Sequence, residues 1–367
     1  MSNNKPPFMG ELTTLSSLCS KGKSSLRQKD LNDAGSYPVY GASGIVGYLE
    51  AYQNDHEYIA VVKDGAGVGR TIKCKGKSSV LGTMQALLPR KGVECDYLLH
   101  LVRALNLGSC FSGSTIPHIY FKDYGKLPVP SFSPEQQRGI SGRFEKVESL
   151  IDLENRTLEC LNHLIKSRFV EMFENDPSIG RTRLKDVCSL ITDGTHQPPK
   201  FQTEGIPFLF VSNIASNELT YETTKYISQE DYETLIARTP IEVGDILVSA
   251  VGSFGHPAIV KDEQPFCFQR HIAYLKPMHT KIDSAFLHAA LLSDESQRYM
   301  DKVAKGAAQR TVTLKSFKEL IIPLPPLPLQ QKFAAFVAEV DKSRFVVQKQ
   351  IENLQTLYDS LAQEYFG

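Results

Sequence analysis

Two long segments of the chain carry apolar residues at alternating intervals of three and four positions. This spacing is typical of helices that pair along a supercoiled seam. Each pattern is longer than one globular domain needs, so we expect the two helices to pair with each other; packing of each helix on its own domain is the alternative. The first seam comprises Ile140, Phe144, Val147, Ile151, Leu158, Leu161, Ile165 and Met172. The second comprises Phe333, Val337, Val340, Val347, Ile351, Leu354, Tyr358, Leu361 and Tyr365.

The residues just before the first seam predict where that helix begins. Ser133 is a favourable N-cap, Pro134 suits the first helical position, and Gln136 completes a capping box. The prolines upstream favour an extended lead-in that is not itself helical. A helix of about 40 residues is roughly 60 Å long.

Elsewhere, short runs of β-branched and aromatic residues are bounded by glycine, proline and aspartate. Such runs predict strands. We predict strands at 58–63, 79–88, 207–211, 245–250 and 271–275, and short helices at 96–107 and 283–292. The globular parts are therefore expected to have a mixed α/β (α+β) fold.

A proline-rich junction followed by Gln-Gln and a basic residue occurs twice, at 127–138 and at 322–332. At a separation of 193 residues, Val147 matches Val340 and Leu161 matches Leu354, and at 188 residues His100 matches His288. An internal repeat indicates two copies of one structural unit. We therefore divide the chain into a first domain at 1–130, a helix at 131–175, a second domain at 176–325 and a helix at 326–367.

Composition adds a contrast between the two copies. The chain has 41 basic and 41 acidic residues, but residues 1–130 carry 15 basic and 10 acidic ones, a net charge of +5. Residues 176–325 carry 16 and 18, a net charge of −2. A basic surface is the usual mark of nucleic-acid binding, so the second copy is expected to rely on a partner. The seven scattered cysteines are expected to be reduced thiols.

Enzyme motifs fail when they are compared with the residues present. The segment Asp64–Thr71 resembles a phosphate loop, but Asp64 stands where glycine belongs, Arg70 replaces lysine, and a strand rather than a helix is expected to follow. Lys5 interrupts the segment 4–8, which otherwise resembles the Asn-Pro-Pro-Phe motif of adenine methyltransferases. The histidines show no metal-ligand spacing. These observations favour a binding role; an unfamiliar nuclease and an adaptor that never contacts DNA stay open as alternatives.

The tandem domain-plus-helix pattern, with Pro-x-Pro and Glu-Gln-Gln before the first helix, resembles the specificity (S) subunit of type I restriction–modification systems, the HsdS family. The resemblance covers Leu12 to Phe366 and includes the turns at 40–44 and 113–115. The chain departs from the pattern at the second junction, where Leu329 stands in place of Glu135.

The resemblance implies two target-recognition domains separated by an antiparallel coiled coil. Each domain would read one half of a bipartite site in double-stranded DNA. The helices and adjoining surfaces would hold two methyltransferase (M) subunits, which the restriction (R) subunits join. The chain itself would be non-catalytic and bind no cofactor, because S-adenosylmethionine serves the methyltransferase. It would act in the cytoplasm of a prokaryote, without a membrane.

Candidate DNA contacts are polar residues in glycine-flanked loops, where side chains can reach phosphates or base edges. In the first copy they are Tyr40, Gly41, Ser43, Lys63, Arg70, Lys73, Lys75, Lys77, Ser114, Thr115 and His118. In the second they are Thr195, His196, Gln197, Ser249, Arg270, Gln309 and Arg310. For each residue, a solvated surface or turn-forming role is the alternative.

Overall fold

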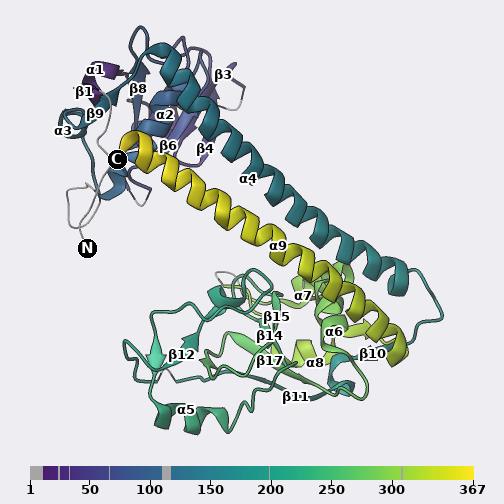
Figure 1. Ribbon diagram of the computed structural model, residues 1–367. Helices are drawn as coiled ribbons and strands as arrows, with labels where there is room; N and C mark the ends of the chain where they lie inside the picture. Colours follow the sequence, from purple (N-terminus) through teal and green to yellow (C-terminus); the bar gives the residue numbers. More distant parts are fainter. Residues whose placement is uncertain are drawn as a thin grey trace. The chain divides into compact units, whose positions relative to one another are not determined.

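The computed structural model describes residues 11–23, 25–32, 34–65, 67–109, 117–197, 199–306 and 309–367 (Figure 1). The chain divides into two compact units. Unit 1 comprises Met1–Asn155 together with Gln348–Gly367, and unit 2 comprises Arg156–Val347.

Unit 1 contains three sheets. The largest has the strand order β2 (Cys19–Lys21), β8 (Met84–Pro89), β5 (Tyr58–Val62) and β6 (Thr71–Cys74). A second has the order β4 (Gly44–Leu49), β3 (Tyr37–Gly41) and β7 (Ser79–Val80), in which β3 and β7 are parallel. The third pairs β1 (Glu11–Thr14) with β9 (Pro128–Ser131).

Unit 2 repeats this arrangement strand for strand. Its largest sheet has the order β11 (Cys188–Asp193), β17 (Ile272–Pro277), β14 (Ile246–Ser249) and β15 (Pro257–Ile259). The second has the order β13 (Tyr226–Ile227), β12 (Ile206–Leu209) and β16 (Cys267–Phe268), again with one parallel pair. The third pairs β10 (Arg181–Arg183) with β18 (Ile321–Pro323). The internal repeat predicted from the junctions is therefore a repeat of topology.

Short helices cover the sheets. Unit 1 contains α1 (Leu15–Leu18), α2 (Cys95–Ala104), α3 (Phe121–Tyr124) and 3-10 turns at Gln28–Asp30 and Leu107–Ser109. Unit 2 contains α5 (Gln229–Ile236), α6 (Ser284–Leu292), α7 (Asp294–Val303), α8 (Leu314–Glu319) and 3-10 turns at Leu184–Asp186 and Val211–Ile214. The central strands β5 and β14 are buried at every residue, which explains why their sequences are apolar except for Ser249.

The two predicted long helices are α4 (Pro134–Phe169), which ends in a π-helical turn at Val170–Glu174, and α9 (Leu327–Phe366). The predicted capping box is present: the Ser133 amide donates to Gln136 Oε1 over 2.9 Å, and the Gln136 amide donates to Ser133 Oγ over 3.3 Å.

Each unit contains a segment of both long helices, teal and yellow in Figure 1, and the segments run in opposite directions. In unit 1 the Arg143 guanidinium lies 5.6 Å from the Tyr365 ring, and the Phe144 ring lies 4.9 Å from the Tyr358 ring. In unit 2 the rings of Phe169 and Phe333 lie 5.7 Å apart. The predicted fold class, a tandem α/β repeat with long antiparallel helices, is confirmed.

One strand prediction was wrong in its extent. The run at 79–88 is not a single strand, because the chain turns at Leu81–Thr83 and the Met84 amide donates back to the Leu81 carbonyl over 2.9 Å. The turn sends β7 into one sheet and β8 into another. Within the described ranges, no helix has both the length and the apolarity that a bilayer-spanning segment requires.

Candidate nucleic-acid interface

Each unit carries a glycine-bounded hairpin at the same place in its largest sheet. In unit 1 it joins β5 to β6, and in unit 2 it joins β14 to β15. The Val62 amide donates to the Arg70 carbonyl over 2.8 Å, and the Ser249 amide donates to the His256 carbonyl over 3.0 Å. Arg70 and His256 therefore occupy equivalent positions at the ends of the two hairpins.

Positive backbone φ angles explain why both hairpins are bounded by glycine. The first hairpin has φ of 95° at Gly65 and 86° at Gly69, and the second has 76° at Gly252 and 84° at Gly255. Only glycine adopts this region without strain. A Cβ on Gly69 would also collide with the backbone of Gly108.

In unit 1 the hairpin brings several predicted residues together. The Arg70 guanidinium donates to the Ala42 carbonyl in the turn beside Ser43 over 3.4 Å. The Tyr40 hydroxyl accepts from the Lys75 amide, also over 3.4 Å. The Lys63 carbonyl accepts from Ile119, the residue after His118. Arg70 and Ser43 are exposed here, while Tyr40 and Gly41 are buried. Exposed Lys75 follows the other end of β6, beyond the pair of Cys74 with Tyr58.

Two predicted residues of unit 1 are held by acidic partners. His118 forms an ion pair with Asp64, and its ring stacks on Tyr120 at 5.4 Å. The Lys73 ammonium lies 2.8 Å from Asp96 and 3.1 Å from Glu57. Lys73 is thus partly neutralised, although it is exposed like Lys75 and Lys77. Ser114 and Thr115 lie outside the described residues.

In unit 2 two loops carry the predicted residues. The Arg270 amide donates to the Thr195 carbonyl over 3.0 Å, and the Thr195 hydroxyl donates to the Gln197 carbonyl over 2.8 Å. His196 and Arg238 both contact the Asp193 carboxylate at 3.0 Å. Sequence reasoning missed Arg238, because it lies far from His196 along the chain.

The second of these loops, which contains Gln309 and Arg310, lies against the hairpin of unit 2. The Gly252 amide donates to the Arg310 carbonyl over 2.9 Å, next to Gln309. The Arg310 guanidinium lies 5.2 Å from the Phe254 ring and pairs with Asp301 at 2.7 Å. Stacking on the ring orients the guanidinium, as a cation–π contact does. Phe254 was not predicted as a site residue.

Ser249 is removed from the candidate DNA contacts. It is 0% exposed, and its hydroxyl accepts from the His256 amide over 2.9 Å. The exposed polar group of this loop is instead Ser253, whose hydroxyl lies 3.0 Å from His256 Nε2. His256 Nδ1 lies 3.0 Å from Asn217 Oδ1, so this side chain is oriented from both sides.

The two hairpins lie at equivalent sheet edges. Strand β5 ends at Val62, opposite the start of β8 at Met84, and β14 ends at Ser249, opposite the start of β17 at Ile272. The candidate residues of unit 2 therefore gather at the edge where the hairpin leaves the largest sheet. In unit 1 the hairpin, the turn at 40–43 and His118 lie there, whereas Lys73, Lys75 and Lys77 lie toward the other end of β6.

A buried glutamine fastens each long helix to its globular part. Gln137 Oε1 accepts from the Glu94 amide before α2 over 2.9 Å, and its Nε2 donates to the Phe132 carbonyl over 2.8 Å. Gln330 Oε1 accepts from the Asp283 amide before α6 over 2.9 Å, and its Nε2 donates to the Pro325 carbonyl over 2.8 Å. We call these contacts the glutamine latches.

The latches correct the residue pairing inferred from sequence. Gln137 is the second glutamine of its pair and Gln330 is the first, so aligning the two Gln-Gln motifs directly is wrong by one residue. Because Glu94 corresponds to Asp283, α2 and α6 are related by 189 residues, with Tyr97 matching the equally buried Phe286. His100 therefore corresponds to Ala289, and its predicted match with His288 was wrong.

The predicted seam residues of both helices are buried or partly buried, Met172 included, whereas their neighbours are mostly exposed. Other apolar side chains of the helices face solvent. Leu164 is 47% exposed and Leu357 is 46% exposed, and these two positions are separated by 193 residues. Leu153 and Val346, at the same separation, are 57% and 55% exposed. Each unit thus exposes one of these residues on α4 and one on α9: Leu153 and Leu357 in unit 1, and Leu164 and Val346 in unit 2. We call the two residues of a unit its helix patch.

The described residues include free thiols and no group of side chains suited to a metal ion. No cluster of histidine, cysteine, aspartate or glutamate among them could hold a metal ion. The six cysteines described are free thiols. Burial raises the pKa of Cys19, Cys74, Cys188 and Cys267 to about 12, so these groups stay protonated at neutral pH.

Comparison with known proteins matches most of the chain to one family. A family model for the type I restriction modification DNA specificity domain matches residues 9–163 and again residues 181–355. The chain is 23% identical over 323 residues to the type I restriction enzyme MjaVIII specificity subunit of Methanocaldococcus jannaschii, covering 81% of this chain and 75% of that protein. It is 28% identical over 170 residues to the EcoBI specificity subunit of Escherichia coli, covering 46% and 36%.

A solved structure shares the fold. The S subunit of a type I restriction-modification system from M. genitalium superposes with a TM-score of 0.55 at 16% identity, covering 100% of this chain and 98% of that one.

Proposed function

The chain belongs to the family of type I restriction–modification specificity subunits, and we propose that each of its two units reads one half of a bipartite site in double-stranded DNA. In this role the chain supplies sequence recognition, and the length of its paired helices sets the number of base pairs between the half-sites.

The observation that carries the proposal is the pair of equivalent hairpins. The same sheet edge presents a glycine-bounded hairpin twice, with Arg70 beside the first and Arg310 beside the second. The backbone is repeated while the exposed side chains differ, as two readers of different half-sites require. Arginine is the side chain most often used to recognise guanine in the major groove.

The helix patches support the docking of two copies of one partner. Leu164 and Leu357 occupy equivalent positions of the repeat and are exposed to a similar extent. Exposed apolar side chains that recur with internal symmetry suit two identical partner subunits. In our proposal these partners are adenine methyltransferase subunits, which use S-adenosylmethionine, and restriction subunits join them.

In this proposal the methyltransferase and restriction subunits carry out the reactions, and this chain contributes DNA binding. Its two copies differ in charge. Residues 1–130 carry a net charge of +5 and residues 176–325 carry −2. The second unit therefore depends more on the partner subunit to neutralise DNA phosphates.

Mapping modified adenines after co-expression of this chain with its methyltransferase subunit tests the proposal. We expect a motif of two short half-sites separated by a fixed number of unspecified base pairs. The purified complex should then bind a duplex carrying that motif, and the Arg70→Ala/Arg310→Ala variant should bind it more weakly. Lys91→Ala is the matched control, because exposed Lys91 follows β8 at the sheet edge opposite the hairpin. Equal binding by all three proteins would favour an adaptor that does not contact DNA.

A further inference from the structure

The hairpin of unit 2 fixes the backbone of its last residue. The His256 amide donates to Ser249 Oγ over 2.9 Å, and the Ser249 amide donates to the His256 carbonyl over 3.0 Å. The Gln297 side-chain amide donates to the Gly255 carbonyl over 2.8 Å. Exposed Ser253 lies in the same hairpin, and its hydroxyl lies 3.0 Å from His256 Nε2. The Ser253 side chain therefore contacts an imidazole whose own backbone is held in place.

The other ring nitrogen of His256 contacts a loop that is anchored to α6. His256 Nδ1 lies 3.0 Å from Asn217 Oδ1. On α6, His288 Nε2 lies 3.0 Å from the Asn217 carbonyl oxygen and 3.0 Å from the Pro257 carbonyl oxygen. One imidazole thus joins the loop to the residue that follows His256.

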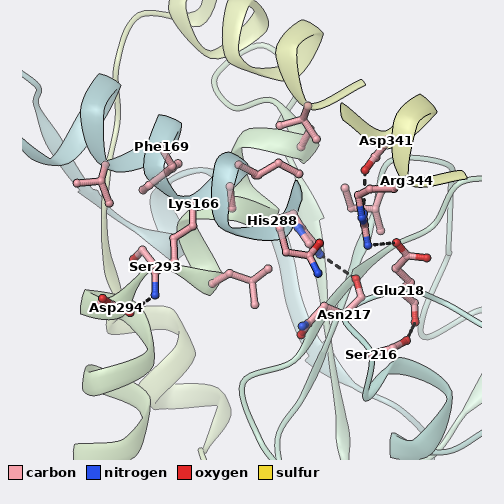
Figure 2. A pocket seen from close by; sticks show the side chains of 18 of the residues that line it. Lys166, Phe169, Ser216, Asn217, Glu218, His288, Ser293, Asp294, Asp341 and Arg344 are labelled. Atoms are coloured by element: carbon pink, nitrogen blue, oxygen red, sulfur yellow. Dashed lines mark hydrogen bonds and ion pairs between the residues drawn. The ribbon is translucent and has the colours of Figure 1, made fainter. Parts of the chain in front are cut away.

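The loop is also joined to a long helix. Glu218 pairs with the Arg344 guanidinium of α9 at 2.8 Å, and Figure 2 shows this pair beside the contact of Asn217 with His288. The same loop forms part of the wall of a cavity of about 330 Å³ in unit 2. The Asn217 carbonyl and the Glu218 side chain therefore both have partners, which hold the loop beside His256.

These contacts determine where the protons lie. The Asn217 side-chain oxygen can only accept, so His256 Nδ1 is the donor in their contact. A neutral imidazole that carries its proton on Nδ1 accepts at Nε2, so the Ser253 hydroxyl donates its proton there. The lone pairs of the exposed Ser253 oxygen are then left to accept a hydrogen bond from a ligand. We call Asn217, His256 and Ser253 the hairpin relay.

The hairpin of unit 1 presents the opposite kind of group. Counted back from Arg70 and His256, Ser253 corresponds to Gly67, which has no side chain. Exposed Arg70 stands where His256 does, and its guanidinium donates hydrogen bonds but cannot accept them. The repeated backbone therefore presents donors in unit 1 and an acceptor in unit 2.

From the hairpin relay we propose that the Ser253 hydroxyl determines specificity by accepting a hydrogen bond from the exocyclic amino group of a DNA base. In the major groove these groups are N6 of adenine and N4 of cytosine, where guanine and thymine carry an oxygen. Asn217 and His256 are positioning residues that act through Ser253. This contact rests on the proposed DNA recognition and adds the chemistry of one base to the half-site of unit 2.

Mapping modified adenines with the full methyltransferase complex is the first test. Ser253→Ala is expected to relax the preference at one position of one half-site and to leave the other half-site unchanged. Asn217→Gly is expected to relax the same position, because it removes the acceptor for His256, and glycine adopts the φ of 65° at residue 217 without strain. Ser189→Ala is the matched control, because exposed Ser189 lies in β11 at the opposite end of the same sheet.

Duplex binding by the purified complex then tests the hydrogen bond itself. The base at the relaxed position is replaced by an analogue without the amino group, purine for adenine or 2-pyrimidinone for cytosine. The native complex is expected to bind this duplex about fivefold more weakly, the effect of one hydrogen bond. The complex with Ser253→Ala should bind both duplexes equally well.

A bipartite motif that Ser253→Ala or Asn217→Gly leaves unchanged would overturn the role of Ser253 and leave the proposed function intact. An analogue that weakens binding equally for the native and Ser253→Ala complexes would also overturn it. If the native complex returns no bipartite motif, the proposed function fails and the role of Ser253 fails with it.

Discussion

Units 1 and 2 fasten their long helices with the same bonds but pack them with different side chains. Gln137 and Gln330 make matching hydrogen bonds of 2.9 and 2.8 Å to the backbone of their own units. A few turns further along the helices, unit 1 stacks His100 on Phe144, whereas unit 2 has the aliphatic side chains of Ala289 and Val337 at the corresponding positions.

The comparison distinguishes two constraints on the sequence, one from hydrogen bonding and one from packing. The latch joins backbone groups of the junction, so substituting it would leave buried amides and carbonyls unpaired, and both copies retain it. The rings of His100, Phe144 and Tyr358, which we call the ring stack, fill volume. Many combinations of apolar side chains can fill the same volume as long as size and shape are kept. The hairpins vary further still, because their side chains are exposed and no packing fixes them.

The largest expected effect comes from breaking the feature that both units share. Gln137→Leu and Gln330→Leu each leave one buried amide and at least one carbonyl unpaired. At about 1–3 kcal/mol for each lost partner, we expect each variant to lower the free energy of unfolding by about 3 kcal/mol, measured by urea denaturation. Gln331→Leu is the control, since exposed Gln331 is expected to change stability by less than about 0.5 kcal/mol. A neutral effect at either latch would show that the junctions are not equivalent.

The next effect concerns the ring stack that distinguishes unit 1. Burial, and then the nearby Arg103, lowers the pKa of His100 to about 4, although Asp96 opposes this shift. The unfolded histidine takes up its proton near pH 6.5, so the stabilising contribution is complete above pH 6.5 and is lost as pH falls toward 4. We expect a loss on the order of 2 kcal/mol across that window.

His100→Phe tests this expectation, because it keeps a ring but removes the titrating group. Urea unfolding between pH 4 and 7 should show a smaller decrease in stability for the variant than for the native chain. Ala289 has no titratable side chain, although burial also lowers the pKa of its neighbour His288. Identical pH dependence of the two proteins would contradict the assignment to His100.

The third expected effect is that each hairpin recognises a different half-site. Arg70→Ala is expected to weaken binding of the bipartite duplex about tenfold and to relax sequence preference in one half-site only. Arg310→Ala should relax the other half-site. Methylome mapping of the two variants measures both outcomes; relaxation of the same half-site by both would contradict the division.

The smallest effect is expected at the hydroxyl of the ring stack. Tyr358→Phe removes the hydrogen bond to His100 Nδ1 and keeps the ring, so unfolding free energy should fall by about 1 kcal/mol. Tyr365→Phe makes the same chemical change elsewhere on α9. Equal losses in both variants would show that the contact with His100 contributes nothing specific.

The periodic parts of the fold could be predicted from sequence, and the contacts between distant segments could not. The seam at Phe144 and Tyr358 and the cap at Ser133 follow from local spacing. The fold class followed from the repeated junction. The break at Leu81–Thr83 was missed although Gly82 lies within it, because one glycine inside a strand pattern does not show that the two ends join different sheets.

The candidate site was only partly accessible to sequence reasoning. The glycines of the hairpins marked the loops, since positive φ favours glycine at Gly65 and Gly252. The burial of Ser249 and the role of Gln137 depend on hydrogen bonds to residues elsewhere in the chain, and no local pattern encodes those partners. The one-residue offset between the two latches was hidden because both junctions contain two consecutive glutamines.

The central claim is that one chain holds two readers whose helices set the spacing of a bipartite site. Inserting seven residues into α4 near Asn155 and seven into α9 near Gln348 keeps the seam in phase and lengthens both helices by about 10 Å. Mapping modified adenines with this variant should return the same two half-sites with a spacer about three base pairs longer, given 3.4 Å per base pair. An unchanged spacer, or altered half-sites, would contradict the account.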